Sequence, residues 1–166
     1  ASDDWCWYWS KYLNHVGTNC IIWTSDADLK QLVQKDSTTG AWTVWFNDRS
    51  GLVLPNSLNH TDMEMLLNFD VVDPFLEDIC HRVGNVTYIN PEDIVMSKVI
   101  CGDTGDNIMA LVRSEHVTKK GKPITKKVSE KEWLIIKESL KINDIQEFKT
   151  NKEKIISAIL SIPRLL

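Results

Sequence analysis

Several protein classes are excluded by what the sequence lacks. No stretch reaches the roughly 18 consecutive apolar residues that a membrane-spanning helix needs. Only 7 glycines and 5 prolines occur among the 166 residues, which excludes collagen-like and low-complexity chains. The first residues, Ala1-Ser2-Asp3-Asp4, are polar and acidic, so no signal peptide is predicted, and the absence of an initiator Met indicates a processed or excised piece.

Closely spaced cysteine pairs are also missing. The four cysteines, Cys6, Cys20, Cys80 and Cys101, form no C-x-x-C motif, and the adjacent Cys80 and His81 are poorly spaced for chelating zinc. Each cysteine lies in an apolar stretch, where a reduced, buried thiol is the common state. A cytoplasmic protein without disulfides is therefore expected.

The composition indicates a globular domain, and the charge distribution along it is uneven. A hydrophobic fraction of 43% and a charged fraction of 25% predict one soluble globular domain with its own core. The net charge is −4, but residues 110–154 carry twelve Lys/Arg against seven Asp/Glu, which leaves −9 on the rest of the chain. An acidic body with a basic C-terminal third favours a cation site beside a surface for polyanions. On charge alone, a solvated, lysine-coated helix is an equally good interpretation.

Hydrophobic periodicity predicts an α/β chain. Apolar residues at helical spacing predict a helix over 4–16 that is apolar nearly all round, and Gly17 would end it. The apolar run Cys20–Trp23 is typical of a buried, parallel strand, and an acidic turn and a helix starting over Leu29–Val33 follow it. The other expected elements are hairpin strands over Ala41–Phe46 and Gly51–Leu54, helices over Asp73–Arg82, Pro91–Ile100 and 151–161, a helix capped by Ser129 and Glu132, and a flexible segment over Lys119–Lys127.

Three acidic pairs lie where carboxylates can be held rigidly. They are Asp3 with Asp4 before a helix, Asp26 with Asp28 after a strand, and Asp103 with Asp106 after a helix. Strand ends and helix starts of an α/β fold can meet at one rim, so we expect the six carboxylates to share a pocket. Such a cluster raises its own pKa values unless cations neutralise it, and all-oxygen ligation suits Mg²⁺ or Mn²⁺. Two ions about 3.5–4 Å apart would clamp a phosphodiester and generate hydroxide.

Taken singly, each acidic pair has a simpler interpretation. The first pair is an ordinary charge pair at a helix N-terminus, and the second is a turn and a helix cap. The third belongs to the segment Gly102–Asn107, which is rich in turn formers. Only the combination of the three pairs indicates a metal site.

The three acidic motifs, in the order in which they occur along the chain, resemble those of the flap endonuclease / 5′–3′ exonuclease family, most closely its phage ribonuclease H branch. The matching segments are the pair Asp3-Asp4 ahead of a helix, Trp23-Thr-Ser-Asp26-Ala-Asp28-Leu-Lys-Gln-Leu32, Pro91-Glu-Asp-Ile94, and Cys101-Gly-Asp103-Thr-Gly-Asp106-Asn107-Ile108. The resemblance covers about residues 1–110. It implies that the chain is a fragment lacking the N-terminal half of the nuclease domain.

The resemblance implies a fold and a chemistry. The fold would be α/β, with a PIN-like three-layer core and a mainly parallel sheet over residues 1–108 (with an insertion at about 40–90), followed by a helical, Lys-rich region over 109–166. The implied reaction is Mg²⁺-dependent hydrolysis of RNA–DNA hybrids and 5′ flaps in replication primer removal. The enzyme would act as a 5′–3′ exonuclease, ribonuclease H and flap endonuclease. Two Mg²⁺ ions, which Mn²⁺ can replace, would be held by Asp3, Asp4, Asp26, Asp28, Asp103 and Asp106, all but Asp3 with catalytic roles.

Basic residues of the C-terminal third are expected to follow a duplex backbone, where phosphate contacts give salt-dependent affinity. They are Arg113, Lys119, Lys120, Lys122, Lys126 and Lys127. A mobile, solvated loop is the alternative interpretation. The expected partners are DNA, RNA–DNA hybrids, flap duplexes and replication proteins, and no membrane association is expected. The protein is expected to be a monomer in the cytoplasm, which would be the host cytoplasm if the chain is phage-encoded. The alternatives to a nuclease active on flaps are a catalytically incomplete DNA-binding module of the same scaffold and a PIN-type ribonuclease.

Overall fold

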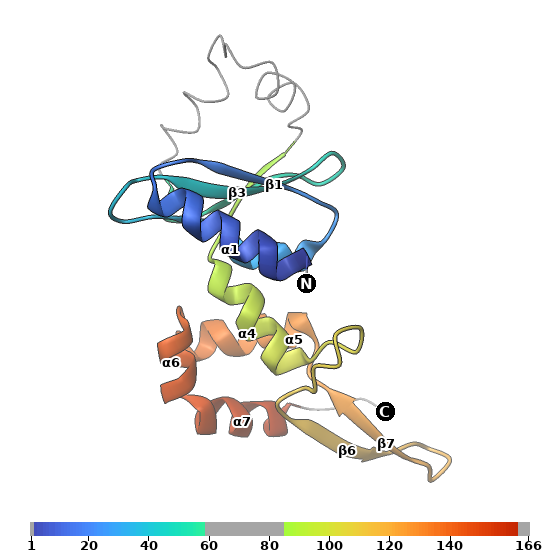
Figure 1. Ribbon diagram of the computed structural model, residues 1–166. Helices are drawn as coiled ribbons and strands as arrows, with labels where there is room; N and C mark the ends of the chain where they lie inside the picture. The colour runs from blue at the N-terminus through green and yellow to red at the C-terminus, as the bar shows by residue number, and fades with distance from the viewer. Residues whose placement is uncertain (1, 59–84, 163–166) are drawn as a thin grey trace. The chain divides into compact units, whose positions relative to one another are not determined.

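A computed structural model describes residues 2–58 and 85–162 of the chain. The chain divides into two units, Ala1–Pro91 and Glu92–Leu166, each with its own packed interior. Both strands and helices form, so the α/β class is confirmed (Figure 1). The expected helix over Asp73–Arg82 lies outside the described residues.

The first unit is built on a mixed sheet. Its strands are β1 (Cys20–Trp23), β2 (Gln34–Lys35), β3 (Trp42–Asn47), β4 (Gly51–Pro55) and β5 (Val86–Ile89), in the order β1-β3-β4-β5 with β2 also paired to β3. β1 runs parallel to β3 and β4 parallel to β5, whereas the β2–β3 and β3–β4 pairs are antiparallel. The parallel strand predicted over Cys20–Trp23 and the hairpin formed by β3 and β4 are thus confirmed.

Alternation along β3 distributes its side chains to the two faces of the sheet. Trp45 packs with Ile22, Leu29 and Val33 beneath the helices, while Val44 and Phe46 belong to a separate cluster with the leucines of β4. Helix α1 (Ser2–His15) and the 3₁₀ helix η1 (Ala27–Leu32) cover the first of these faces. Among the described residues these are the helices of the first unit, so the three-layer PIN-like arrangement stays a prediction.

Helix α1 is attached to the sheet by a buried amide. Asn14 is 0% exposed, and its Nδ2 donates to the carbonyl oxygens of Trp42 (3.0 Å) and Thr18 (3.1 Å). Its Oδ1 accepts from Thr43 Oγ1 (2.7 Å) and Gln34 Nε2 (2.8 Å). All the hydrogen-bonding capacity of this amide is used, which is what burial of a polar group requires.

The second unit is mainly helical, with a β-hairpin that extends beyond the helices (Figure 1). Its elements are α4 (Pro91–Cys101), β6 (Arg113–Val117), β7 (Pro123–Lys127), α5 (Glu130–Leu140), α6 (Ile145–Thr150) and α7 (Lys152–Ser161). Met96 and Ile100 of α4 pack in one core with Trp133 of α5 and Ile155 of α7. Because of this packing, α4 belongs to the second unit, whereas the sequence analysis placed it in a catalytic portion ending at residue 108.

The predicted N-terminal cap of α5 is confirmed, and the structure adds further helix ends in the second unit. Ser129 caps α5 in a reciprocal capping box with Glu132, as expected. Lys141 ends that helix in the left-handed conformation, at φ 54°. The next helix, α6, was not predicted, and it begins where Asp144 accepts from the Glu147 N–H.

Three cysteines lie in the described residues, and all of them carry free thiols: Cys6, Cys20 and Cys101. Burial raises the pKa of the Cys20 and Cys101 thiols, which keeps both protonated at neutral pH. Of the three, Cys101 is buried as expected, whereas Cys6 and Cys20 are half-buried; Cys80 lies outside the described residues.

We predict that Asn14→Ala destabilises the first unit by about 2–4 kcal/mol, because it leaves the buried Trp42 carbonyl and Thr43 hydroxyl without their partner. Urea unfolding followed by tryptophan fluorescence measures the change. Asn56→Ala, at an exposed position, is the control and should change stability by less than about 0.5 kcal/mol. A loss for Asn14→Ala as small as that of the control would contradict this role for the amide.

Candidate metal centre and nucleic-acid interface

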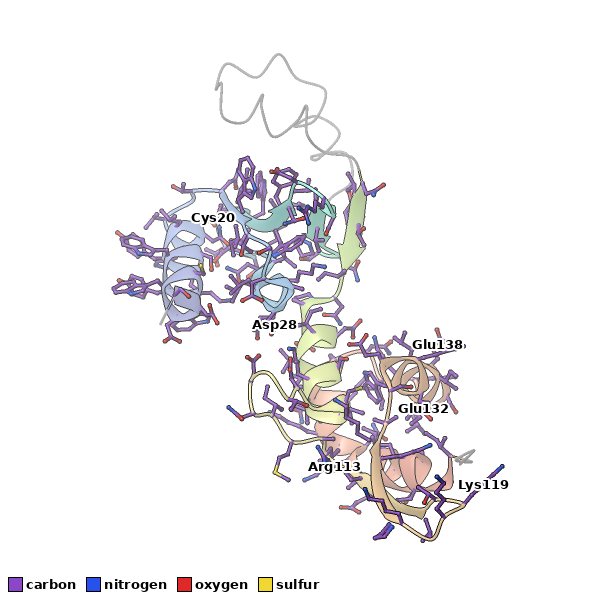
Figure 2. The ribbon with its side chains drawn as sticks, turned by 90° about the vertical axis from the view of Figure 1, so that its right-hand side faces the viewer. Cys20, Asp28, Arg113, Lys119, Glu132 and Glu138 are labelled. Carbon is purple, nitrogen blue, oxygen red and sulfur yellow. The ribbon has the colours of Figure 1, made fainter. Side chains whose placement is uncertain are left out.

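Asp26 and Asp28 follow the carboxyl end of β1 and are held by local hydrogen bonds. Asp26 caps η1, with its Oδ1 accepting from the Asp28 N–H at 2.9 Å. The Asp26 carbonyl oxygen accepts from Trp45 Nε1 at 2.9 Å, and its N–H donates to Thr24 Oγ1. Asp26 is exposed, and Asp28 is half-buried on η1 (Figure 2). The turn is therefore anchored to the sheet core through the indole of Trp45.

Asp3 and Asp4 lie in the first turn of α1 and are both exposed. An apolar groove of about 520 Å³ lies between α1 and the β1 segment, and both Asp3 and Asp26 line it. Asp4 lines a different hollow, among the tryptophans on the outer side of α1. The first unit thus brings Asp3 and Asp26 to one groove and places Asp4 apart from them.

Asp103 and Asp106 belong to a tight turn after α4. The backbone groups of Asp103 and Ile108 bond each other in both directions, at 2.9 and 2.8 Å, and Asn107 takes a left-handed conformation with φ 58°. Gly102 precedes the turn at φ 69°, and a Cβ there would lie 2.6 Å from the Ala110 nitrogen. Only glycine fits this approach, so the backbone itself requires Gly102 at the start of the G-D-x-x-D-N sequence.

Lys98 on α4 is the cation of this turn. Its Nζ forms an ion pair with Asp103 Oδ2 and lies 3.8 Å from Asp106 Oδ2. The hydrogen bond from Lys98, together with the Gly105 N–H on the other oxygen, holds the pKa of Asp103 below its usual range. The two carboxylates thus face the same cation. Sequence reasoning missed Lys98, and its place in the last turn of a predicted helix was the available signal.

Several of the predicted ligands present carboxylates suited to a divalent cation. Asp28 in the first unit and Asp103 in the second are half-buried, and Asp106 is exposed. Their donor set is entirely carboxylate oxygen, which fits Mg²⁺, Mn²⁺ or Ca²⁺ better than softer metals. These residues could bind a metal ion, whereas the convergence of all six carboxylates on one pair of Mg²⁺ ions stays a prediction.

The basic segment is a β-hairpin, so the expectation of a flexible segment over Lys119–Lys127 was wrong. β6 and β7 pair antiparallel from Arg113–Lys127 to Val117–Pro123. The Thr118 N–H donates to the Lys122 carbonyl at 2.9 Å, and Gly121 enables the turn with φ 75°. Cross-strand bonding therefore orders a sequence whose glycine, proline and lysine content resembles that of a loop.

The hairpin exposes its cations to solvent. Lys126 is half-buried, and the exposed ones are Arg113, Lys119, Lys120, Lys122 and Lys127. Figure 2 shows Arg113 at the end of the hairpin near the helices and Lys119 near the turn. Arg113 and Lys127 are directly opposed in the ladder, a like-charge pair that is unfavourable without an anion nearby. The predicted nucleic-acid-binding residues thus share one projecting ribbon.

No protein-family model, curated protein sequence or solved structure matches this chain. Within residues 2–58 and 85–162, no helix is both long and apolar enough to span a membrane.

We predict that Lys98→Gln raises the pKa of Asp103, because it removes the ammonium that bonds the carboxylate. The low pKa in the folded state means that the pair stabilises the turn above the unfolded carboxyl pKa of about 3.9 and that this stabilisation is lost as the pH falls through the folded value. A ¹³C NMR titration of the carboxyl groups measures the shift. Lys137→Gln is the control, because Lys137 pairs with Asp93 instead. An unchanged Asp103 pKa in Lys98→Gln would contradict the assignment.

Proposed function

We propose that this chain contributes to a Mg²⁺-dependent, structure-specific 5′ nuclease that hydrolyses RNA–DNA hybrids and 5′ flaps. The observation that carries the proposal is a pair of aspartates fixed at the carboxyl end of a parallel strand, combined with a second pair fixed in a glycine-dependent turn. Both pairs belong to motifs that resemble the flap endonuclease / 5′–3′ exonuclease family. A PIN-like core is part of the same proposal.

Within this proposal, the metal is held by the four aspartates Asp26, Asp28, Asp103 and Asp106. Asp3 and Asp4 would add further carboxylate ligands. A bound pair of Mg²⁺ ions would supply Lewis-acid activation of water and stabilise charge on the phosphate. The local structure contributes ionised, preoriented ligands: Asp103 is kept deprotonated by Lys98, and Asp26 is fixed by its cap and by the Trp45 indole.

The cations of the β6–β7 hairpin favour the interpretation that the substrate is a duplex. Its exposed lysines and Arg113 form a charged ribbon that would contact phosphates without reading sequence. Binding of this kind suits an enzyme that recognises the shape of a flap or hybrid rather than its bases.

A DNA-binding module without catalysis is the second candidate, and Lys98 favours it. Because the ammonium already compensates part of the charge on Asp103 and Asp106, the turn is stable without a metal. The hairpin likewise needs no metal to attract a polyanion. A PIN-type ribonuclease would differ from both candidates by preferring single-stranded RNA.

Cleavage assays with Mg²⁺ distinguish these candidates. We expect the complete enzyme that contains this chain to cleave a 5′-flap duplex and an RNA–DNA hybrid, and Asp103→Asn to reduce the rate by about 10²-fold or more while sparing binding. Asparagine keeps an acceptor for the Gly105 N–H and removes the charge, so the turn is preserved. Glu153→Gln, at an exposed position on α7, is the matched control.

Each outcome of the cleavage assay selects one candidate. Full activity in Asp103→Asn would contradict the metal-ligand role. Duplex binding without cleavage by the unaltered complete enzyme would favour the binding module, and cleavage restricted to single-stranded RNA would favour the ribonuclease.

We predict that Lys119→Ala combined with Lys120→Ala weakens duplex binding and lowers the slope of log K against log salt by about 1–2. The reason is that each lysine bound to a phosphate displaces about one counterion from the duplex, so the variant displaces fewer of them. Fluorescence anisotropy at several salt concentrations measures the slope. Lys152→Ala with Lys154→Ala, on exposed positions of α7, is the control and should leave the slope unchanged. An equal change in both variants would remove the hairpin from the interface.

A further inference from the structure

The exposed cations of the β6–β7 hairpin form two groups at opposite ends of the ribbon. The base group is Arg113 with Lys127, which are opposite each other in the first rung of the ladder. The tip group is made of the exposed lysines between the two strands, Lys119, Lys120 and Lys122. Figure 2 shows Arg113 at the helix end of the ribbon and Lys119 near its turn. The exposed positive charge is therefore concentrated at two separate places.

Both groups are available to an anion. None of the ion pairs between described residues involves a side chain of either group. Because Arg113 and Lys127 are directly opposite, their side chains lie on the same face of the ribbon, where their like charges repel each other. A phosphate bound beside both side chains would offset this repulsion and accept hydrogen bonds from the guanidinium and the ammonium. The base of the hairpin is thus suited to a phosphate.

The part of the ladder between the two groups has a different composition. From the Glu115–Thr125 rung to the Val117–Pro123 rung it contains neither Lys nor Arg. Val117 is 57% exposed, and Pro123 opposite it is exposed as well. A ribbon that followed a single phosphate backbone would need cations along its whole length. A middle without cations, which also exposes an apolar rung, instead fits the space of a groove between two backbones.

The distance between the two groups fits the major groove of B-form DNA. Arg113 is five residues from Thr118, where the turn begins, and extended strands span roughly 17 Å over that length. The major groove is about 12 Å wide and admits a two-stranded β-ribbon, whereas the minor groove is about 6 Å wide. A ribbon that crosses the major groove therefore places one group at each of the two bordering backbones, and it is far too long for the minor groove.

Duplex RNA does not offer the same groove. The major groove of an A-form helix is deep and narrow, so a ribbon cannot cross it with a cation group at each border. The geometry of the hairpin thus favours a B-form DNA duplex over an A-form RNA duplex, although both carry the same backbone charge.

We propose that the β6–β7 hairpin crosses the major groove of a DNA duplex, with the base group on the phosphates of one strand and the tip group on those of the other. This inference rests on the proposed function and names the part of the substrate that the hairpin binds, which is a B-form DNA arm of the flap duplex. Because both contacts are made to phosphates, the hairpin recognises the width of the groove and does not read the base sequence.

Ethylation interference on a 5′-flap DNA duplex tests the crossing, because ethylation removes the charge of single phosphates and the flap junction fixes the register of the bound protein. Binding is measured in EDTA, so that neither cleavage nor a metal bound to the aspartates contributes. We expect two patches of interfering phosphates, one on each strand, that face each other across the major groove. Patches on one strand only, patches that face each other across the minor groove, or no patch at all would overturn the proposal.

Two double variants assign each patch to one end of the hairpin. Arg113→Ala with Lys127→Ala should remove the patch on one strand, and Lys119→Ala with Lys120→Ala should remove the patch on the other. Each should lower the slope of log K against log salt by about 1–2. All four side chains are exposed, so circular dichroism should show an unchanged fold. Loss of the same patch in both variants, or of neither patch in either, would overturn the two-strand contact.

The control and the comparison with RNA use the same assay. Lys152→Ala with Lys154→Ala, at exposed positions on α7, should keep both patches. An RNA duplex of the same length should bind more weakly than the DNA duplex, and equal affinity would overturn the assignment to the major groove.

The result is separable from that of the cleavage assay. Two patches without Mg²⁺-dependent cleavage would contradict the proposed nuclease and support the groove contact. Cleavage without the two patches would overturn the groove contact alone.

Discussion

Four hydrogen bonds of the buried Asn14 amide join the first helix to strand β3 and to the segments around it. The attachment lies in the last turn of α1, while Cys6 nearer its start packs against the core beneath the sheet. At the start of the helix, Asp3 lines one groove with Asp26, which follows β1. A buried polar side chain with all its hydrogen bonds made thus anchors one end of α1, and an apolar residue could not replace those bonds.

The acidic pairs are held by local backbone geometry in each unit. In the first, a cap and an indole hydrogen bond fix Asp26; in the second, Gly102 and the left-handed Asn107 fix Asp103. The pair in the second unit also has a counter-ion in Lys98, which lowers the pKa of Asp103 and keeps that carboxylate ionised. Ionised, oriented carboxylates are the local preconditions for a hard divalent cation. The basic hairpin adds an element whose charge suits a phosphate backbone.

Much of the fold could be predicted from the sequence where local signals were strong. The Asn47–Ser50 turn marked the β3–β4 hairpin, and the Ser129 capping box marked α5. Strand β5 was missed because its pairing with β4 comes from a distant part of the chain. The β6–β7 hairpin was misjudged because cross-strand bonding, which composition does not reveal, orders it. At the candidate site the aspartates were found by motif order, whereas Lys98 and the Trp45 indole were missed because their roles depend on three-dimensional contacts.

We propose that carboxylates from the separate acidic motifs bind one metal centre. Titration with substoichiometric Mn²⁺, followed by NMR line broadening of backbone amides, tests this shared site, because a bound paramagnetic ion broadens only its neighbours. We expect the amides of Asp26, Asp28, Asp103 and Asp106 to broaden together at the lowest metal concentrations, with those of Asp3 and Asp4. Broadening that is scattered over the surface, or confined to one acidic pair, would contradict a shared metal centre and leave the basic hairpin as the functional element.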